Sequence, residues 1–79
     1  MAALVTVRYW AGARRAAGRE SEQLHADTLA DLLAQLSAHP PLAPVVAASA
    51  ILVDELAADP AQLLHEGAVV DILPPFAGG

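Results

Sequence analysis

One amphipathic helix most constrains how this 79-residue chain can fold. Thr28 is a residue type that caps helix N-termini, with Asp31 three residues on as a weaker form of the capping-box partner. The helix's leucines follow at spacings of three and four residues, which places them on one face: Leu29, Leu32, Leu33 and Leu36. Pro40 is expected to end the helix near Ala38. A helix of about three turns can cover one face of a small sheet, so the rest of the chain must supply that sheet.

Four other segments have the patterns of strands. Leu4–Trp10 alternates and is rich in β-branched and aromatic residues, which predicts a half-buried strand. Glu20–His25 is polar and is predicted to be an edge strand paired with the first. Ala50–Val53 is a continuous apolar run, which predicts a central strand covered on both faces. Ala68–Leu73 is predicted to be the last strand and to end at the prolines that follow it.

The connections between these segments predict smaller elements. Ala13–Ala17 is expected to form a short helical turn or a loop, and Val45–Ser49 a short helix or a crossover. Leu56–Ala57 is expected to pair briefly after a turn. Asp59 followed by Pro60 has the pattern of a helix start, which predicts a single helical turn through Leu64.

The order of elements predicts an α+β fold with one main helix on a mixed sheet. If the first and last strands pair in the centre, the arrangement is the β-grasp, or ubiquitin-like, roll; a split βαβ sandwich also fits the same elements. Residues 1–74 are expected to form this domain, and residues 75–79 an extended tail. The chain has no cysteine, so its core depends on aliphatic packing.

Composition argues against several classes of function. The net charge is −5, and all four basic residues are arginines between positions 8 and 19, so we expect no nucleic-acid binding. These arginines are interpreted as a solvated face rather than a binding patch. No apolar stretch is long enough for a membrane span, and a cytoplasmic location is expected. The acidic remainder favours a partner with a basic docking surface.

The sequence also lacks the residue patterns of a thiol nucleophile, a metal site or a phosphate-binding loop. Without cysteine there is no thiol nucleophile. The three histidines, His25, His39 and His65, are too widely spaced for a local metal site, so no metal is expected. No glycine-rich phosphate loop follows a strand.

The sequence ends in Pro-Pro-Phe-Ala-Gly-Gly, and this tail is the strongest functional candidate. Pro74 and Pro75 favour a stiff, extended exit, and four further residues reach about 13 Å from the body. Ala77, Gly78 and Gly79 have so little side-chain bulk that they can thread a narrow channel in another protein. A terminal carboxylate is ionised at neutral pH and is a poor electrophile, so it needs activation, for instance as an acyl-adenylate.

These features resemble the small, sulfur-carrying subunit of molybdopterin synthase, among the ubiquitin-like sulfur carriers. The resemblance runs nearly end to end and includes residues 7–11, residues 28–33 and Glu66–Gly67. Its most specific part is residues 72–79, because a Pro-Pro-x-Ala-Gly-Gly terminus is a strong signal and Gly-Gly alone is a weak one. The sequence departs from the family pattern at Asp54–Glu55, where Asn-Gly is common, at Ala68, and at Phe76, where a smaller residue is common.

The resemblance implies a mechanism. A ubiquitin-activator-like adenylyltransferase would use ATP to adenylate Gly79, and a sulfur donor would replace AMP to leave a thiocarboxylate. The tail would enter the large subunit of the synthase and give its sulfur to cyclic pyranopterin monophosphate. Pro74 and Pro75 would aim the tail, Phe76 would dock it, and Ala77 and Gly78 would let it thread. The chain would bind no cofactor and would not be catalytic alone.

Three alternatives stay open at this stage. The sulfur can serve cysteine synthesis, thiazole synthesis or tRNA thiolation instead of molybdopterin. The chain can be a ubiquitin-like protein modifier, joined through Gly79 to lysines of targets; it cannot form lysine-linked chains on itself, because it has no lysine. It can also be a β-grasp interaction module whose tail is inert.

Overall fold

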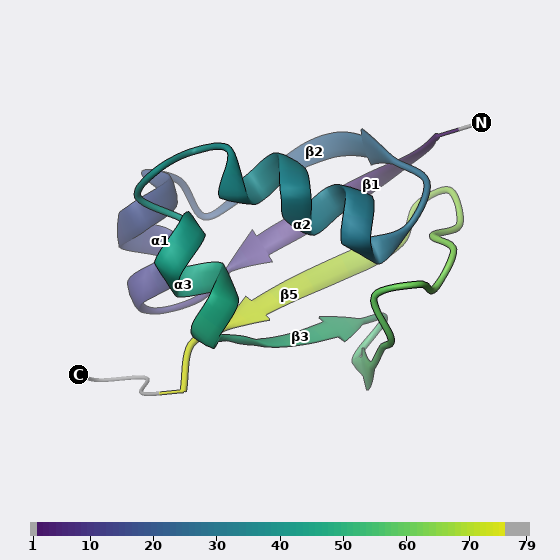
Figure 1. Cartoon of the computed structure of the whole chain (residues 1–79). Coiled ribbons are helices and arrows are strands. Elements are labelled where there is room, and N and C mark those ends of the chain that lie inside the picture. The colour runs from purple at the N-terminus through teal and green to yellow at the C-terminus, as the bar shows by residue number, and fades with distance from the viewer. Residues whose placement is uncertain (1, 76–79) are drawn as a thin grey trace.

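The computed structural model describes residues 2–75 and contains a five-stranded mixed sheet with α2 lying across one face (Figure 1). The strands are β1 (Ala3–Tyr9), β2 (Ser21–Ala26), β3 (Ala50–Val53), β4 (Leu56–Ala57) and β5 (Val69–Leu73). The helices are α1 (Gly12–Ala17), α2 (Leu29–Ser37) and α3 (Ala43–Ala48). Within residues 2–75, no helix has the length and apolar character that crossing a membrane requires.

The strand order across the sheet is β2-β1-β5-β3-β4. The first and last strands, β1 and β5, run parallel in the centre, and the other neighbours pair antiparallel. This order confirms the predicted β-grasp arrangement and excludes the split βαβ alternative. Because β1 and β5 are parallel, their C-terminal ends lie side by side at the same end of the sheet, where Tyr9 pairs with Ile72.

The core lies between α2 and one face of the sheet. In β1 every second residue is buried, from Ala3 to Tyr9, as the alternating sequence predicts. The largest fully buried side chains come from α2 and the two central strands: Val5, Val7, Tyr9, Leu29, Leu32, Val70 and Ile72. The opposite face of the sheet, called the open face here, carries Leu4, Thr6 and Arg8 of β1 and Val69, Asp71 and Leu73 of β5.

The start of α2 is capped as the sequence predicts. The Thr28 hydroxyl accepts a hydrogen bond from the backbone N–H of Asp31 at 3.1 Å. The Asp31 carboxylate in turn accepts from the backbone N–H of Asp27, also at 3.1 Å, one residue earlier than in the usual capping box. The first bond satisfies a donor that the first turn of a helix leaves unpaired, and the second ties the residue before the cap to that turn.

The structure corrects two sequence predictions, the covering of β3 and the extent of the turn at residues 59–64. β3 is not a central strand covered on both faces: it lies between β5 and the two-residue β4, and Ala50 is exposed. An apolar run does not reveal by itself how many faces are covered. The helical turn predicted for Asp59–Leu64 forms only at its start, where Asp59 accepts from the backbone N–H of Ala61 through Oδ1 at 2.8 Å and from that of Gln62 through its carbonyl at 2.9 Å. It does not continue to Leu64, because the carbonyl oxygens of Pro60 and Gln62 accept from the first residues of α2 and Leu63 forms a bridge with Thr28.

The turn between β3 and β4 holds two non-glycine residues in the left-handed region, Asp54 at φ 49° and Glu55 at φ 70°. Such a two-residue hairpin favours Asn-Gly, which is where the sequence departs from the family pattern. We expect Glu55→Gly to raise the free energy of unfolding by about 0.5 kcal/mol. Relief of left-handed strain of about 1–2 kcal/mol outweighs an entropic cost for glycine of about 0.5–1 kcal/mol. Urea denaturation measures the change.

Glu55→Ala is the matched control for this prediction. It removes the same charge but keeps a Cβ atom in the left-handed region, so it is expected to bring no gain. An equal gain in both variants would assign the effect to the lost charge rather than to the backbone. Asp54 is left unchanged in both, because its carboxylate accepts from the backbone N–H of Val69 at 3.0 Å.

Candidate functional site: the C-terminal exit and the open face

The described base of the tail is Pro74 and Pro75, which follow directly on β5. Pro74 is half-buried and Pro75 is exposed. Four of the predicted site residues, Phe76, Ala77, Gly78 and Gly79, lie outside the described residues, so the roles given to them stay predictions. The described structure brings the tail's base out of the sheet at the end of a central strand (Figure 1).

Backbone pairing holds the end of β5 on both sides. Ile72 pairs with Tyr9 of β1, and Leu73 pairs with Ala50 of β3. Just beyond β1, the backbone N–H of Trp10 donates to the carbonyl of Ile72 at 3.3 Å. Because β1 holds Ile72 and β3 holds Leu73, the direction in which the tail leaves is set by the sheet rather than by a free loop.

Next to this exit the open face carries a polar cluster of Arg8, Asp71 and Trp10. The Arg8 guanidinium donates twice to Asp71, from Nε to Oδ1 at 2.7 Å and from Nη2 to Oδ2 at 2.9 Å. The indole Nε1 of Trp10 donates to the same Oδ1 at 2.9 Å. The guanidinium also lies over the Trp10 ring, 5.8 Å from its centroid, within cation–π range.

Burial differs sharply among the three residues of this cluster. Asp71 is buried, whereas Trp10 is 41% exposed and the Arg8 side chain 42%. Asp71 therefore serves as a buried anchor that fixes two exposed groups in place. The hydrogen bond from Arg8 lowers the pKa of Asp71 and, with that from Trp10, outweighs desolvation, which acts to raise it. The carboxylate consequently stays ionised at neutral pH.

Sequence reasoning missed this cluster. It grouped Arg8 with the other arginines of a solvated face and placed Trp10 only at the end of the first predicted strand. A signal was available, because Arg8 is the one charged residue of β1 and Asp71 the one charged residue of β5. Opposite charges on two neighbouring central strands predict a cross-strand ion pair, provided that the register is known.

The other arginines are mainly exposed, as a solvated face requires. Arg14 pairs with Glu20 at 3.5 Å and Arg19 with Glu22 at 3.7 Å. Such exposed pairs add little to stability.

The histidines do not come together. His65 Nε2 bonds the Asp54 carboxylate at 2.5 Å, and this contact raises the pKa of His65 and lowers that of Asp54. The pair ties the segment before β5 to the β3–β4 turn. Across residues 2–75, no group of three or more His, Asp or Glu side chains lies close enough to hold a metal ion.

Comparison with known proteins shows which family and which solved structures this chain resembles. The ThiS family matches residues 7–79 of the chain. No curated protein matches. Molybdopterin converting factor subunit 1 from Pyrococcus furiosus has a TM-score of 0.86 at 24% identity, covering 94% of this chain and 99% of that one.

Two further solved structures are similar over nearly their whole length. Small archaeal modifier protein 1 from Methanosarcina acetivorans has a TM-score of 0.83 at 26% identity, covering 100% of this chain and 99% of that one. The complex of subunits 1 and 2 of molybdopterin-converting factor from Helicobacter pylori matches with a TM-score of 0.78 at 27% identity, covering 96% and 99%. Because the family model spans residues 7–79 and the first and last strands are parallel neighbours in the centre of the sheet, the chain belongs to the ThiS family and has the β-grasp fold of the ubiquitin-like sulfur carriers.

Proposed function

We propose that this chain is the sulfur carrier of a molybdopterin synthase, with the carboxylate of Gly79 as its reactive group. The observation that carries the proposal is the Pro74–Pro75 exit from the end of a central strand, followed in the sequence by Phe-Ala-Gly-Gly. A tail with a stiff base and a tip without bulky side chains suits delivery of one reactive group into another protein's active site.

The proposed sulfur transfer has three steps. A carboxylate oxygen of Gly79 attacks the α-phosphate of ATP in a ubiquitin-activator-like adenylyltransferase, and pyrophosphate leaves. A hydrosulfide donor then attacks the acyl carbon and AMP leaves, which gives the thiocarboxylate directly; a persulfide donor gives an acyl disulfide instead, which a second thiol cleaves by forming a disulfide with the donor and releasing the thiocarboxylate. Finally the thiocarboxylate sulfur attacks a carbon of cyclic pyranopterin monophosphate, an oxygen substituent of that carbon leaves, and water hydrolyses the resulting thioester, which returns the Gly79 carboxylate and leaves the sulfur on the pterin. All catalytic side chains belong to the partner proteins.

Support for a large-subunit partner comes from the Helicobacter pylori neighbour, which is a complex of subunits 1 and 2 of molybdopterin-converting factor. The open face of this chain is suited to such a contact, because Trp10 and Arg8 stand exposed and fixed beside the tail's base. Aromatic and arginine side chains held in one conformation are the types that dominate interface energies. A partner that binds the open face would therefore contact the chain directly beside the base of the tail.

The test of the pathway uses chain carrying a chemically installed C-terminal thiocarboxylate. Mixed with the purified large subunit and cyclic pyranopterin monophosphate, it is expected to yield molybdopterin and to return to the carboxylate form. Loss of sulfur to a cysteine or thiazole precursor instead, with none to the pyranopterin, would assign the chain to another sulfur pathway.

A second candidate function is that of a protein modifier, because small archaeal modifier protein 1 has a similar structure, with a TM-score of 0.83. In that case Gly79 would form an amide with lysines of target proteins. Adducts of higher mass that disappear on removal of Gly78 and Gly79 would support it. The two functions share the adenylation step and differ in what attacks the activated carbonyl.

The contact by the open face leads to a prediction on Trp10. We expect Trp10→Ala to weaken binding to the large subunit at least about 30-fold, corresponding to a hot-spot loss of about 2 kcal/mol. The fold should persist, because Trp10 is 41% exposed and Asp71 keeps both bonds from Arg8. Isothermal titration calorimetry measures the affinity.

Leu63→Ala is the control for Trp10→Ala. Leu63 is 75% exposed but lies beside the start of α2, where it bridges Thr28. It should bind the large subunit like the unmodified chain. Equal affinity of the Trp10 and Leu63 variants would show that the open face does not form the contact.

A further inference from the structure

The imidazole ring of His65 lies between two hydrogen-bond acceptors. Its Nε2 bonds the Asp54 carboxylate at 2.5 Å, and its Nδ1 lies 2.9 Å from the backbone carbonyl oxygen of Glu66. An ionised carboxylate and a carbonyl can only accept, whereas a neutral imidazole carries a single N–H. Both contacts are therefore hydrogen bonds only when His65 is protonated on both ring nitrogens.

Asp54 connects this histidine to the start of β5. Its Oδ1 accepts from the backbone N–H of Val69 at 3.0 Å, and its own backbone N–H donates to the Val69 carbonyl at 2.8 Å. The carboxylate is thus shared between Val69 and His65. A protonated His65 thereby ties the β3–β4 turn to the segment that leads into β5.

The turn that is held in this way has a strained backbone. Asp54 and Glu55 have φ angles of 49° and 70°, in the left-handed region that a residue with a Cβ atom adopts at a cost. Such a conformation persists where the surrounding contacts over-determine it. Here those contacts are the bonds of Asp54 to Val69 and His65, so we expect the turn to relax when His65 lets go.

Other titratable or charged groups lie on the elements packed around this pair. They are Glu66 of the same segment, Glu55 of the turn, Asp27 after β2, His25 of β2 and Arg8 of β1. The Glu66 carboxylate is engaged elsewhere, since it accepts from the backbone N–H of Leu4 at 2.9 Å. The bond and charge of Asp54, with the bond to the Glu66 carbonyl, raise the pKa of His65.

We propose that His65 and Asp54 form a proton-dependent latch, which holds the β3–β4 turn against the start of β5 while His65 is protonated and loosens it when His65 is neutral. Both side chains are exposed, at 64% and 45%, so the latch responds to the pH of the solvent. The turn borders a hollow of about 310 Å³ whose lining includes Arg8 of the open face. The latch therefore makes the shape of this part of the open face depend on pH.

The direction of the pH dependence follows from the two pKa shifts. The pKa of His65 is raised above its ordinary value of about 6.5, so the latch is closed below that value and opens as the pH rises through the raised pKa. The pKa of Asp54 is lowered by the same contact, so its carboxylate stays ionised throughout this range. The inference does not rest on the proposed sulfur-carrier function, and its test uses the chain alone.

The test is NMR on the ¹⁵N-labelled chain from about pH 5 to about pH 9, the range that spans histidine titration. The amide signals of Glu55, Leu56 and Val69 are expected to shift with the same midpoint as the His65 ring. Solvent exchange of the Val69 amide is corrected for its intrinsic pH dependence. The protection of this amide should fall about two- to fivefold once His65 is neutral, the range that an exposed ion pair allows.

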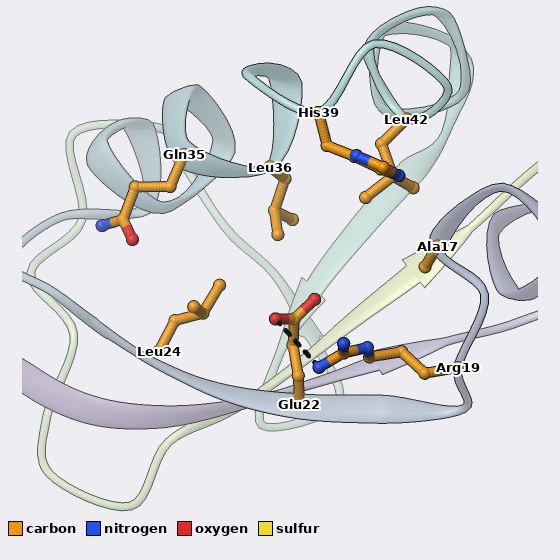
Figure 2. Close-up of a pocket in the computed structure, with 8 residues that line it drawn as sticks. All are labelled: Ala17, Arg19, Glu22, Leu24, Gln35, Leu36, His39 and Leu42. Carbon is orange, nitrogen blue, oxygen red and sulfur yellow. Dashed lines mark ion pairs between the residues drawn. The ribbon is translucent and has the colours of Figure 1, made fainter.

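Three variants assign the response to this pair. His65→Gln removes the titrating group and Asp54→Asn removes the charge that it contacts, while asparagine still tolerates the left-handed backbone; both should abolish the response of Val69. His39→Gln is the matched control and should keep it. His39 lies just past α2 and lines the groove between α2 and β2 (Figure 2), at the opposite edge of the sheet from the β3–β4 turn.

Glu55→Gly tests the link to the strained turn. Glycine adopts the left-handed backbone without a Cβ penalty, so the turn should keep its conformation with the latch open. The loss of Val69 protection should then shrink by at least about half, within the small effect of an exposed pair. Glu55→Ala removes the same charge but keeps the Cβ atom, so it should respond like the unmodified chain.

Two results would overturn the proposal. One is a His65 ring that titrates while the amide signals of the turn and of Val69 stay unchanged. The other is a response that survives in His65→Gln or Asp54→Asn, which would assign it to a different titrating group such as His25.

Discussion

Deletion of Gly79 is expected to lower the rate of adenylation by at least about 100-fold, because a displacement of about 1 Å at a reacting centre can cost that much. The shortened chain still ends in a glycine carboxylate, that of Gly78, but the group falls about 3.3 Å short of its position. The defect should appear in exchange of labelled pyrophosphate into ATP with the activating enzyme. Binding to that enzyme should change little, since the folded body is intact.

Phe76→Ala is the control for this deletion. It keeps the length of the tail and the terminal carboxylate, so it should be adenylated even if its docking to the large subunit is weaker. Unchanged adenylation of the Gly79 deletion would mean that position along the tail does not matter, contrary to the threading role given to residues 77–79.

Leu32→Ala is expected to lower the free energy of unfolding by about 2–5 kcal/mol, the range for leucine removed from a packed core. Leu32 is fully buried at the middle of α2, against the central strands. A domain of this size has a total stability of about 4–12 kcal/mol, so this loss is a large part of it. The melting temperature should fall by at least about 10 °C.

Leu63→Ala again provides the matched comparison, because it removes the same atoms from a leucine that is 75% exposed. Leu63→Ala should change the free energy of unfolding by no more than about 0.5 kcal/mol. Similar losses for the two variants in calorimetry would contradict the placement of the core under α2.

The sequence predicts this fold well where periodicity and burial coincide. The leucine spacing of α2 and the alternation of β1 reflect the same one-sided core, and a Thr cap and a proline mark the helix ends. The central pairing of β1 with β5 follows from their apolar character. Each of these features is local or repeats along one element, which is why a single sequence reveals it.

Features that depend on register or on contacts distant in sequence were not predicted. β3 is apolar but half-covered, and nothing local shows which of its faces is open. Residues 59–64 carry a helix-start pattern, yet their backbone is recruited by the first turn of α2. The bonds from Arg8 and Trp10 to Asp71 span more than 60 residues of sequence, and the strand pairing alone brings these groups together.

The most direct measurement for the sulfur-carrier account is the intact mass of the chain after incubation with its activating enzyme, ATP and a sulfur donor. The account predicts a gain of about 16 Da, the replacement of one oxygen by sulfur, and fragmentation should place it on Gly79. The gain should require ATP and should vanish from the Gly79 deletion. An unchanged mass with an activating enzyme that converts another ThiS-family carrier under the same conditions would contradict the account.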